Sequence, residues 1–127
     1  MEQEGESMGN PFLEPTNVFM YTLDLLRPAI KIEGPTETEA ASVKRHWAHL
    51  QDLATKGQLI FAGRTLSIDD DGFASVIFRA SSEDEARAVM ERDPGIRENL
   101  FRGHLFPYQV LLMGTWVPEK ESTGGEK

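Results

Sequence analysis

Two side chains that could exchange protons fall on the apolar faces of two predicted helices. On a helical wheel at about 100° per residue, His46 lies within the apolar stripe of the helix expected over residues 36–56. Asp93 lies one turn after Val89, in the middle of the apolar face of the helix expected from residue 82. An unpaired buried carboxylate is costly, so Asp93 needs a partner. Both helices are expected on one face of a sheet, where His46 can supply it.

A histidine paired with a carboxylate is suited to proton transfer. The carboxylate fixes the tautomer of the imidazole and makes its other nitrogen more basic. The pair can then act as a general acid or base near neutral pH. The same residues could instead form a purely structural hydrogen bond, or Asp93 could end its helix before Pro94 with its side chain in solvent. The sequence leaves these alternatives open.

Three more residues are candidates for binding a substrate. Arg64 follows Gly63 in an otherwise apolar strand, where its guanidinium either reaches solvent or binds an anionic ligand. Arg27 ends the first predicted strand and could lie near the same strand ends. His49 is expected to face solvent, with a position near the site as the alternative. No nearby carboxylate completes a familiar set of metal ligands with the histidines, so we expect neither a metal nor a cofactor.

The predicted elements that position these residues follow the order β-α-β-β-α-β. Helical spacing predicts the first helix, and the Asp-Gly turn at residues 71–72 predicts a hairpin. Ser82 begins a second helix with capping-box spacing, and Pro94 ends it. Strands are expected at residues 18–26, 59–68, 73–80 and 109–116, and the first helix has the apolar stripe Val43, Trp47, Leu50 and Ala54. This order is typical of a ferredoxin-like α+β sandwich, with one antiparallel sheet and both helices on one face.

The second and third strands are apolar at most positions, so both of their faces are expected to be buried. Two helices cover only one face of the sheet. A second copy of the sheet is the simplest cover for the other face, which predicts a homodimer through the sheet faces. Tyr21 and Trp47 are expected in the core rather than against a ligand.

The composition narrows the class of partner. The chain of 127 residues fits one domain, and 21 Asp and Glu against 13 Lys and Arg give a net charge of -8. Such a surface repels the phosphates of nucleic acid and anionic lipid, so we expect neither nucleic acid nor a membrane as a partner. The absence of cysteine excludes disulfides, thiolate nucleophiles and cysteine-bound metals.

The two ends of the chain are expected to be flexible tails. Residues 1–17 and 117–127 are rich in Glu, Gly, Ser and Thr and poor in apolar side chains, which leaves residues 18–116 as the domain. The N-terminus lacks the basic and apolar regions of a signal peptide, and no apolar run approaches the roughly 20 residues that cross a bilayer. We therefore expect a cytoplasmic location.

Two motifs resemble those of the YciI-like, or YCII-related, family. Residues 46–53 (HWAHLQDL) and 57–63 (GQLIFAG) are similar to its histidine-bearing helix followed by G-x-L-x-x-A-G-P. Residues 82–86 and 90–94 resemble its second helix, which ends in D-P. The similarity covers residues 18–116. It departs from the family pattern at Arg64, which stands where the pattern has proline.

The resemblance implies a dimeric α+β barrel with a His–Asp active site, carried over onto His46 and Asp93. Some relatives eliminate HCl from hydroxylated, chlorinated aromatic rings, and the fold also includes lactone isomerases. We therefore expect a cofactor-independent lyase or isomerase, like a dehydrochlorinase or a muconolactone isomerase, for a small cyclic or aromatic, anionic compound. His46 would move the proton, Asp93 would orient His46, and Arg64 would hold a carboxylate or enolate oxygen. The alternatives are a non-catalytic ligand-binding or accessory dimeric module and a monooxygenase-like barrel.

Overall fold

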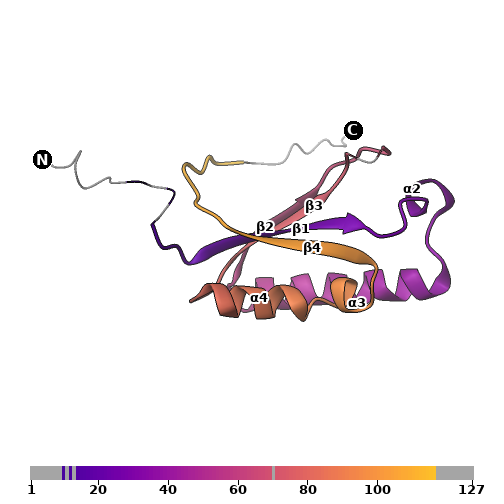
Figure 1. The fold of residues 1–127 in the computed structure, drawn as a ribbon, viewed down its shortest axis with the longest axis horizontal. Helices are drawn as coiled ribbons and strands as arrows, with labels where there is room; N and C mark the ends of the chain where they lie inside the picture. Colours follow the sequence, from indigo (N-terminus) through magenta and orange to yellow (C-terminus); the bar gives the residue numbers. More distant parts are fainter. Residues whose placement is uncertain (1–9, 11, 13, 70, 117–127) are drawn as a thin grey trace, which may run out of the picture.

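Four antiparallel strands form one sheet in the order β2-β3-β1-β4. A computed structural model describes residues 10, 12, 14–69 and 71–116. The strands are β1 (Val18–Leu25), β2 (Leu59–Arg64), β3 (Ala74–Arg79) and β4 (Phe101–Pro107). The helices are α2 (Ile30–Glu33), α3 (Glu37–Thr55), α4 (Glu83–Glu91) and α5 (Pro94–Arg97). The long helices α3 and α4 lie on one face of the sheet (Figure 1). The predicted ferredoxin-like α+β fold is confirmed.

Local sequence signals set the starts of the helices. Thr36 caps α3 in a complete capping box, since its hydroxyl accepts from the Glu39 N–H and the Glu39 carboxylate accepts from the Thr36 N–H. Ser82 accepts from the Glu85 N–H at the start of α4. Asp93 begins α5 in the same way, and Pro94 occupies the first helical position.

The last strand is the principal error of the sequence prediction. Residues 109–116 have strong β-propensity but are not in a strand, and β4 is Phe101–Pro107 instead. This strand contains Gly103, where an added Cβ would lie 2.6 Å from Ile96 and 3.2 Å from Met90. The glycine weakens the local strand pattern but allows α4 and α5 to approach the sheet closely. Every residue of β4 pairs with β1, and this pairing favours residues 101–107 over residues 109–116 as the strand.

The buried stripe of α3 is rotated from the predicted one. The buried side chains of α3 are Ser42, Leu50 and Leu53, and His46 lies between them with 12% of its side chain exposed. Val43 and Trp47 were predicted in the core but are 44% and 59% exposed. Two polar residues, Ser42 and His46, have their own partners inside the protein, so hydropathy alone misplaces the inward face.

The core lies between the sheet and the helices. It includes Tyr21 of β1, Phe78 of β3 and Val89 of α4, so the prediction that Tyr21 is a core residue is confirmed. The outer face of the sheet, turned away from α3 and α4, has an apolar row across all four strands. In register these residues are Phe61, Ile77, Met20 and Phe106.

The second and third strands were predicted to be buried, and this holds for β3 but not for β2. Val76, Ile77 and Phe78 of β3 are buried, whereas Phe61 and Ala62 of β2 are exposed in the single chain, because β2 is an edge strand. Of the ranges expected as tails, residues 10, 12 and 14–17 of the first are described, and residues 117–127 lie outside the described residues. Of the helices in the described part of the chain, none combines the length and the apolar character of a membrane span.

Candidate active site

His46 and Asp93 are in direct contact. The Nδ1 atom of His46 lies 2.8 Å from Oδ1 and 2.9 Å from Oδ2 of Asp93. This contact joins α3 to the start of α5, which are 47 residues apart in the chain. Because an ionised carboxylate only accepts hydrogen bonds, Nδ1 is assigned as the protonated nitrogen. Nε2 is then the basic nitrogen of the neutral imidazole, and no described residue hydrogen bonds to it.

Asp93 is fully buried and accepts from two further donors. The Tyr21 hydroxyl donates to Oδ2 at 2.7 Å, and the Gly95 N–H donates to Oδ1 at 2.8 Å. Burial alone would raise the pKa of Asp93, but the bonds from His46, Tyr21 and Gly95 outweigh it and lower the pKa. Burial beside this carboxylate raises the pKa of Tyr21 far above its ordinary value, so the phenol stays a donor. The carboxylate is therefore held ionised and oriented.

A second polar cluster fixes the distance between α3 and α5. The Glu98 carboxylate accepts from Ser42 Oγ at 2.6 Å and from Arg45 Nη2 at 2.7 Å and Nε at 2.9 Å. The Arg45 guanidinium and the Ser42 hydroxyl lower the pKa of Glu98 to about 2. Ser42 lies one turn before His46, so the cluster holds the histidine-bearing turn of α3 against the helix that Asp93 caps.

A cavity of about 630 Å³ lies between α3 and the sheet, and His46 lines it. Its volume is within the range of small-molecule sites. The wall is largely apolar and includes Leu23, Trp47, Leu50, Ala62, Phe73 and Phe101. Phe101 packs edge-on against the imidazole with ring centroids 5.1 Å apart. The site therefore combines a histidine held by a buried carboxylate with a wall suited to an apolar ring.

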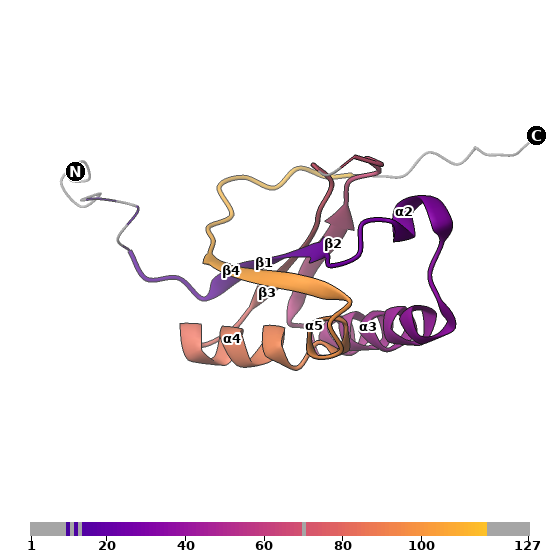
Figure 2. The ribbon, with the colours of Figure 1, turned by 45° about the vertical axis from the view of Figure 1, so that its right-hand side comes forward.

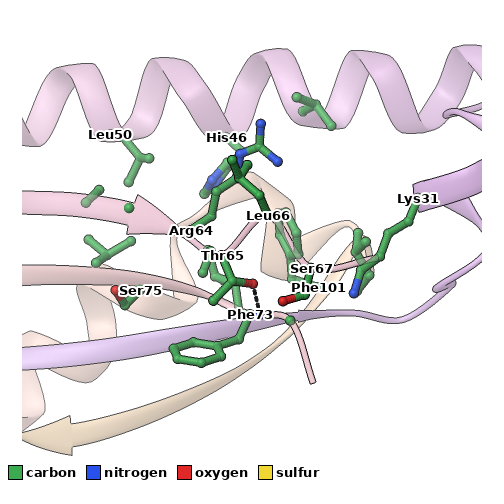
Figure 3. A pocket seen from close by; sticks show the side chains of 18 of the residues that line it. Lys31, His46, Leu50, Arg64, Thr65, Leu66, Ser67, Phe73, Ser75 and Phe101 are labelled. Atoms are coloured by element: carbon green, nitrogen blue, oxygen red, sulfur yellow. Dashed lines mark hydrogen bonds between the residues drawn. The ribbon is translucent and has the colours of Figure 1, made fainter. Parts of the chain in front are cut away.

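Two cationic side chains also line this cavity. Arg64 extends from β2 toward α3, where His46 is placed, as Figure 3 shows. Lys31 comes from α2, and its Nζ donates to the main-chain oxygen of Asp69 at 2.5 Å. Sequence reasoning missed Lys31, because a helix of four residues carries no periodic signal. The cavity can accept an anionic group at either cation.

Arg27, the other predicted binding residue, lies outside this cavity. Its guanidinium donates to both oxygens of Glu39, at 2.8 and 2.7 Å, and to Glu33 at 2.9 Å. The fork of Arg27 holds the pKa of Glu39 at about 2. Arg27 thus joins α2 to the start of α3, and through α2 it supports the position of Lys31.

His49 does not face solvent as predicted. It is half-buried, and its Nε2 has no hydrogen-bond partner among the described residues. Burial lowers the pKa of His49, with smaller contributions from His46 and Arg92, although the charge of Asp93 acts in the opposite direction. His49 does not line the cavity and so stays apart from the candidate site.

His49 gives a pH dependence to the stability. Since its pKa is below the ordinary 6.5 in the folded chain, the unfolded chain takes up the proton first as the pH falls. Its contribution is therefore present above pH 6.5 and is lost as the pH falls through the lower pKa of the folded state. We expect His49→Gln to flatten the decrease in unfolding free energy in that window, measured by urea denaturation. His104→Gln, at an exposed histidine, is the control, and an equal effect of both variants would contradict this role.

No group of three or more acidic or histidine side chains in the described part of the chain could hold a metal ion. The sequence profile of the YCII-related domain matches residues 25–113. The chain belongs to the YCII-related family. The resemblance predicted from the two motifs is thereby confirmed.

A solved structure of a known enzyme has the same fold. The chain is similar to TftG, the 5-chloro-2-hydroxyhydroquinone dehydrochlorinase of Burkholderia phenoliruptrix, which was solved in complex with 2,5-dihydroxybenzoquinone. The two sequences are 23% identical, the match covers 72% of this chain and 93% of the TftG chain, and the TM-score is 0.54. A variant of SnoaB, a cofactor-independent oxygenase from Streptomyces nogalater, matches 76% of this chain and 93% of its own with 13% identity and a TM-score of 0.40. Comparison with curated protein sequences gives no match.

Proposed function

We propose that this YCII-related protein is a cofactor-independent lyase or isomerase that moves a proton on a small, cyclic or aromatic, anionic compound. The observation that supports it is the geometry of His46, which is bound at Nδ1 to the buried Asp93 and lines an apolar cavity. An imidazole held in this way is a general base whose orientation is set before the substrate binds.

In the proposed reaction His46 Nε2 takes a proton from a ring carbon. The electron pair of the broken C–H bond forms a new double bond to the neighbouring carbon. In a lyase reaction that carbon loses a leaving group with its bonding pair, and in an isomerase reaction an existing double bond at that carbon opens and its electron pair moves to the next atom. In the second case the imidazolium returns the proton to another carbon. Asp93 stays ionised throughout and stabilises the imidazolium through Nδ1–H. Arg64 neutralises the oxygen on which negative charge develops.

The substrate class follows from the wall of the cavity. Apolar and aromatic side chains favour a ring, and Arg64 and Lys31 favour an anionic oxygen substituent. TftG, which has the same fold, is named for a chlorinated hydroxyhydroquinone and was solved with a dihydroxybenzoquinone. A small oxygenated ring is therefore the class of compound to test first.

We also propose that the protein is a homodimer through the outer face of the sheet. Phe61 and Phe106 at the two ends of the apolar row are exposed in the single chain, and two such faces would cover each other. The cytoplasmic location stays a prediction from the sequence, as do the absence of a cofactor and the flexible tails.

The function is tested by following candidate ring compounds with the protein in deuterium oxide by NMR. We expect exchange of a ring proton, or its loss together with a leaving group, in at least one anionic compound. Compounds that bind at the cavity without any proton exchange or elimination would contradict the proposal and favour the ligand-binding module.

Arg64→Gln is expected to weaken binding of an anionic ring about tenfold or more, because the substitution removes the fork that pairs with its charged oxygen. Isothermal calorimetry with 2,5-dihydroxybenzoquinone measures the change. Arg79→Gln, at an exposed arginine of β3 outside the cavity, should leave the affinity unchanged. Equal affinities of the two variants would contradict a role of Arg64 in binding.

A further inference from the structure

An extended, apolar and largely exposed segment follows β4. In residues 109–116 (QVLLMGTW), Leu111, Leu112 and Trp116 are 85%, 90% and 83% exposed. Figures 1 and 2 both show the segment on the side of the sheet away from α3 and α4. Large apolar side chains at successive positions of one segment are unusual on a surface that faces water. They indicate that something else covers this segment.

The composition of the segment favours a β-strand, and β2 has a free edge that could pair with it. The sheet order leaves both β2 and β4 at edges. On β4, Arg102 and His104 are exposed, and charged residues of this kind discourage pairing. On β2, Arg64 is the one charged residue among the four exposed ones, and Phe61, Ala62 and Gly63 are uncharged, which makes β2 the more favourable edge.

The segment cannot readily reach β2 of its own chain. β2 lies three strand spacings from β4 in the sheet, so a strand on its free side would lie four spacings away, which is about 19 Å at about 4.8 Å per spacing. At about 3.3 Å per residue, crossing the sheet would use about six residues and leave too few to pair. Two hydrogen bonds also hold the residue before the segment beside the start of β1: the Tyr108 N–H donates to Val18 O, and Thr16 Oγ1 donates to Tyr108 O.

The cavity of the candidate site is incomplete on this same edge. Residues 62–68, from β2 and the turn after it, all line the cavity, and no described strand lies beyond them. A strand added beside β2 would place alternate side chains on the side of Ala62 and Arg64, which face the cavity. The other side chains would continue the apolar row that begins at Phe61. A strand buried on both faces is apolar throughout, as residues 110–113 are.

We propose that residues 109–116 of one copy form a fifth strand along β2 of a second copy and complete the wall of its cavity. The inference rests on the proposed homodimer and goes beyond it. At about 100 Å² for each aliphatic side chain and about 200 Å² for the tryptophan, two such strands and the surfaces that cover them bury on the order of 2,000 Å². A stable interface needs about 1,200 Å² or more. The arrangement is reciprocal, as two-fold symmetry requires.

The absence of native cysteine makes disulfide cross-linking a direct test. One full-length chain carries Phe61→Cys, and a second, differently tagged chain carries a cysteine at one position from 110 to 113. The two chains are expressed together and oxidised. Disulfides need Cα atoms within about 7 Å, so we expect covalent heterodimers at alternate positions of the scan. Asp84→Cys, on the exposed surface of α4, replaces Phe61→Cys in the control.

The outcomes separate this inference from the homodimer. A dimer by light scattering with no cross-link above the control would overturn the strand exchange and leave the dimer through the sheet faces. A monomer would overturn both.

A full-length point variant gives a second readout of the same inference. Leu112→Asp should weaken both the dimer and the binding of 2,5-dihydroxybenzoquinone about tenfold or more. Ile32→Asp, at an isoleucine that is also exposed, should change neither. Unchanged dimerisation and binding in Leu112→Asp would overturn the inference.

Discussion

Asp93→Ala is expected to lower the free energy of unfolding by about 3–5 kcal/mol, because it removes one partner of a buried, hydrogen-bonded pair. The carboxylate is fully buried and accepts from the Tyr21 hydroxyl, the Gly95 N–H and His46 Nδ1. All three donors would lose their acceptor, and α5 would lose its N-terminal cap. For a domain of this size, the midpoint of thermal unfolding should fall by on the order of 10–20 °C.

Two further variants distinguish this effect from a general loss of charge. Asp93→Asn keeps one acceptor and is expected to cost less than Asp93→Ala. Asp52→Ala removes the partner of Lys56 in an exposed pair on α3 and should change the stability by about 0.5 kcal/mol or less. If Asp93→Ala cost no more than Asp52→Ala, the buried network would not support the fold as described.

The stability that Asp93 contributes depends on pH, and the direction of this dependence follows from its pKa. The pKa of Asp93 is below its ordinary 3.8 in the folded chain, so the unfolded chain binds the proton first as the pH falls. The contribution of Asp93 is therefore complete above pH 3.8 and is lost as the pH falls through the lower folded pKa. The gap in stability between the native chain and Asp93→Ala should shrink in that window, measured by chemical denaturation.

His46→Gln is expected to lower turnover by about 10²–10⁴-fold on a substrate identified by NMR, which is the usual contribution of a general acid or base. Glutamine can still donate a hydrogen bond toward Asp93 but has no nitrogen that takes up a proton near neutral pH. The loss should appear in kcat, with far-UV circular dichroism unchanged. Steady-state kinetics with the purified variant measure it.

The matched control for His46→Gln keeps the imidazole and perturbs its support. Tyr21→Phe removes one donor to Asp93 and should cost about 1 kcal/mol of stability, with a much smaller effect on kcat. A His46→Gln variant that kept more than about a tenth of the native turnover would exclude His46 as the group that moves the proton.

The two largest expected effects arise from one structural feature. Asp93 caps α5, satisfies Tyr21 and orients His46, so stability and proposed chemistry share a side chain. Catalytic groups are often held by bonds that also stabilise the fold. Comparing Asp93→Ala with His46→Gln separates the two contributions, because only the first leaves several buried donors without an acceptor.

Local signals in the sequence were sufficient to predict the family, most of the helices and strands, and the pairing of His46 with Asp93. Thr36 and Ser82 cap their helices, β2 and β3 pair as the predicted hairpin, and α4 ends before Asp93-Pro94. Each of these signals acts over a few residues, so each can be interpreted without the rest of the chain. The inward position of His46 also follows from its helical phase.

Long-range contacts decided the rest. β4 was missed because pairing with β1, some 80 residues earlier, outweighs the β-propensity of residues 109–116. Hydropathy misplaced Val43 and Trp47 because it does not show that Ser42 and His46 have partners at the two ends of α5. The bond from Tyr21 to Asp93 and the arrival of Lys31 at the cavity likewise depend on elements far apart in the chain. The sequence by itself determined which residues could do chemistry. The tertiary structure decided which of them are in contact, because a contact between distant elements does not change the periodicity of the residues in either element.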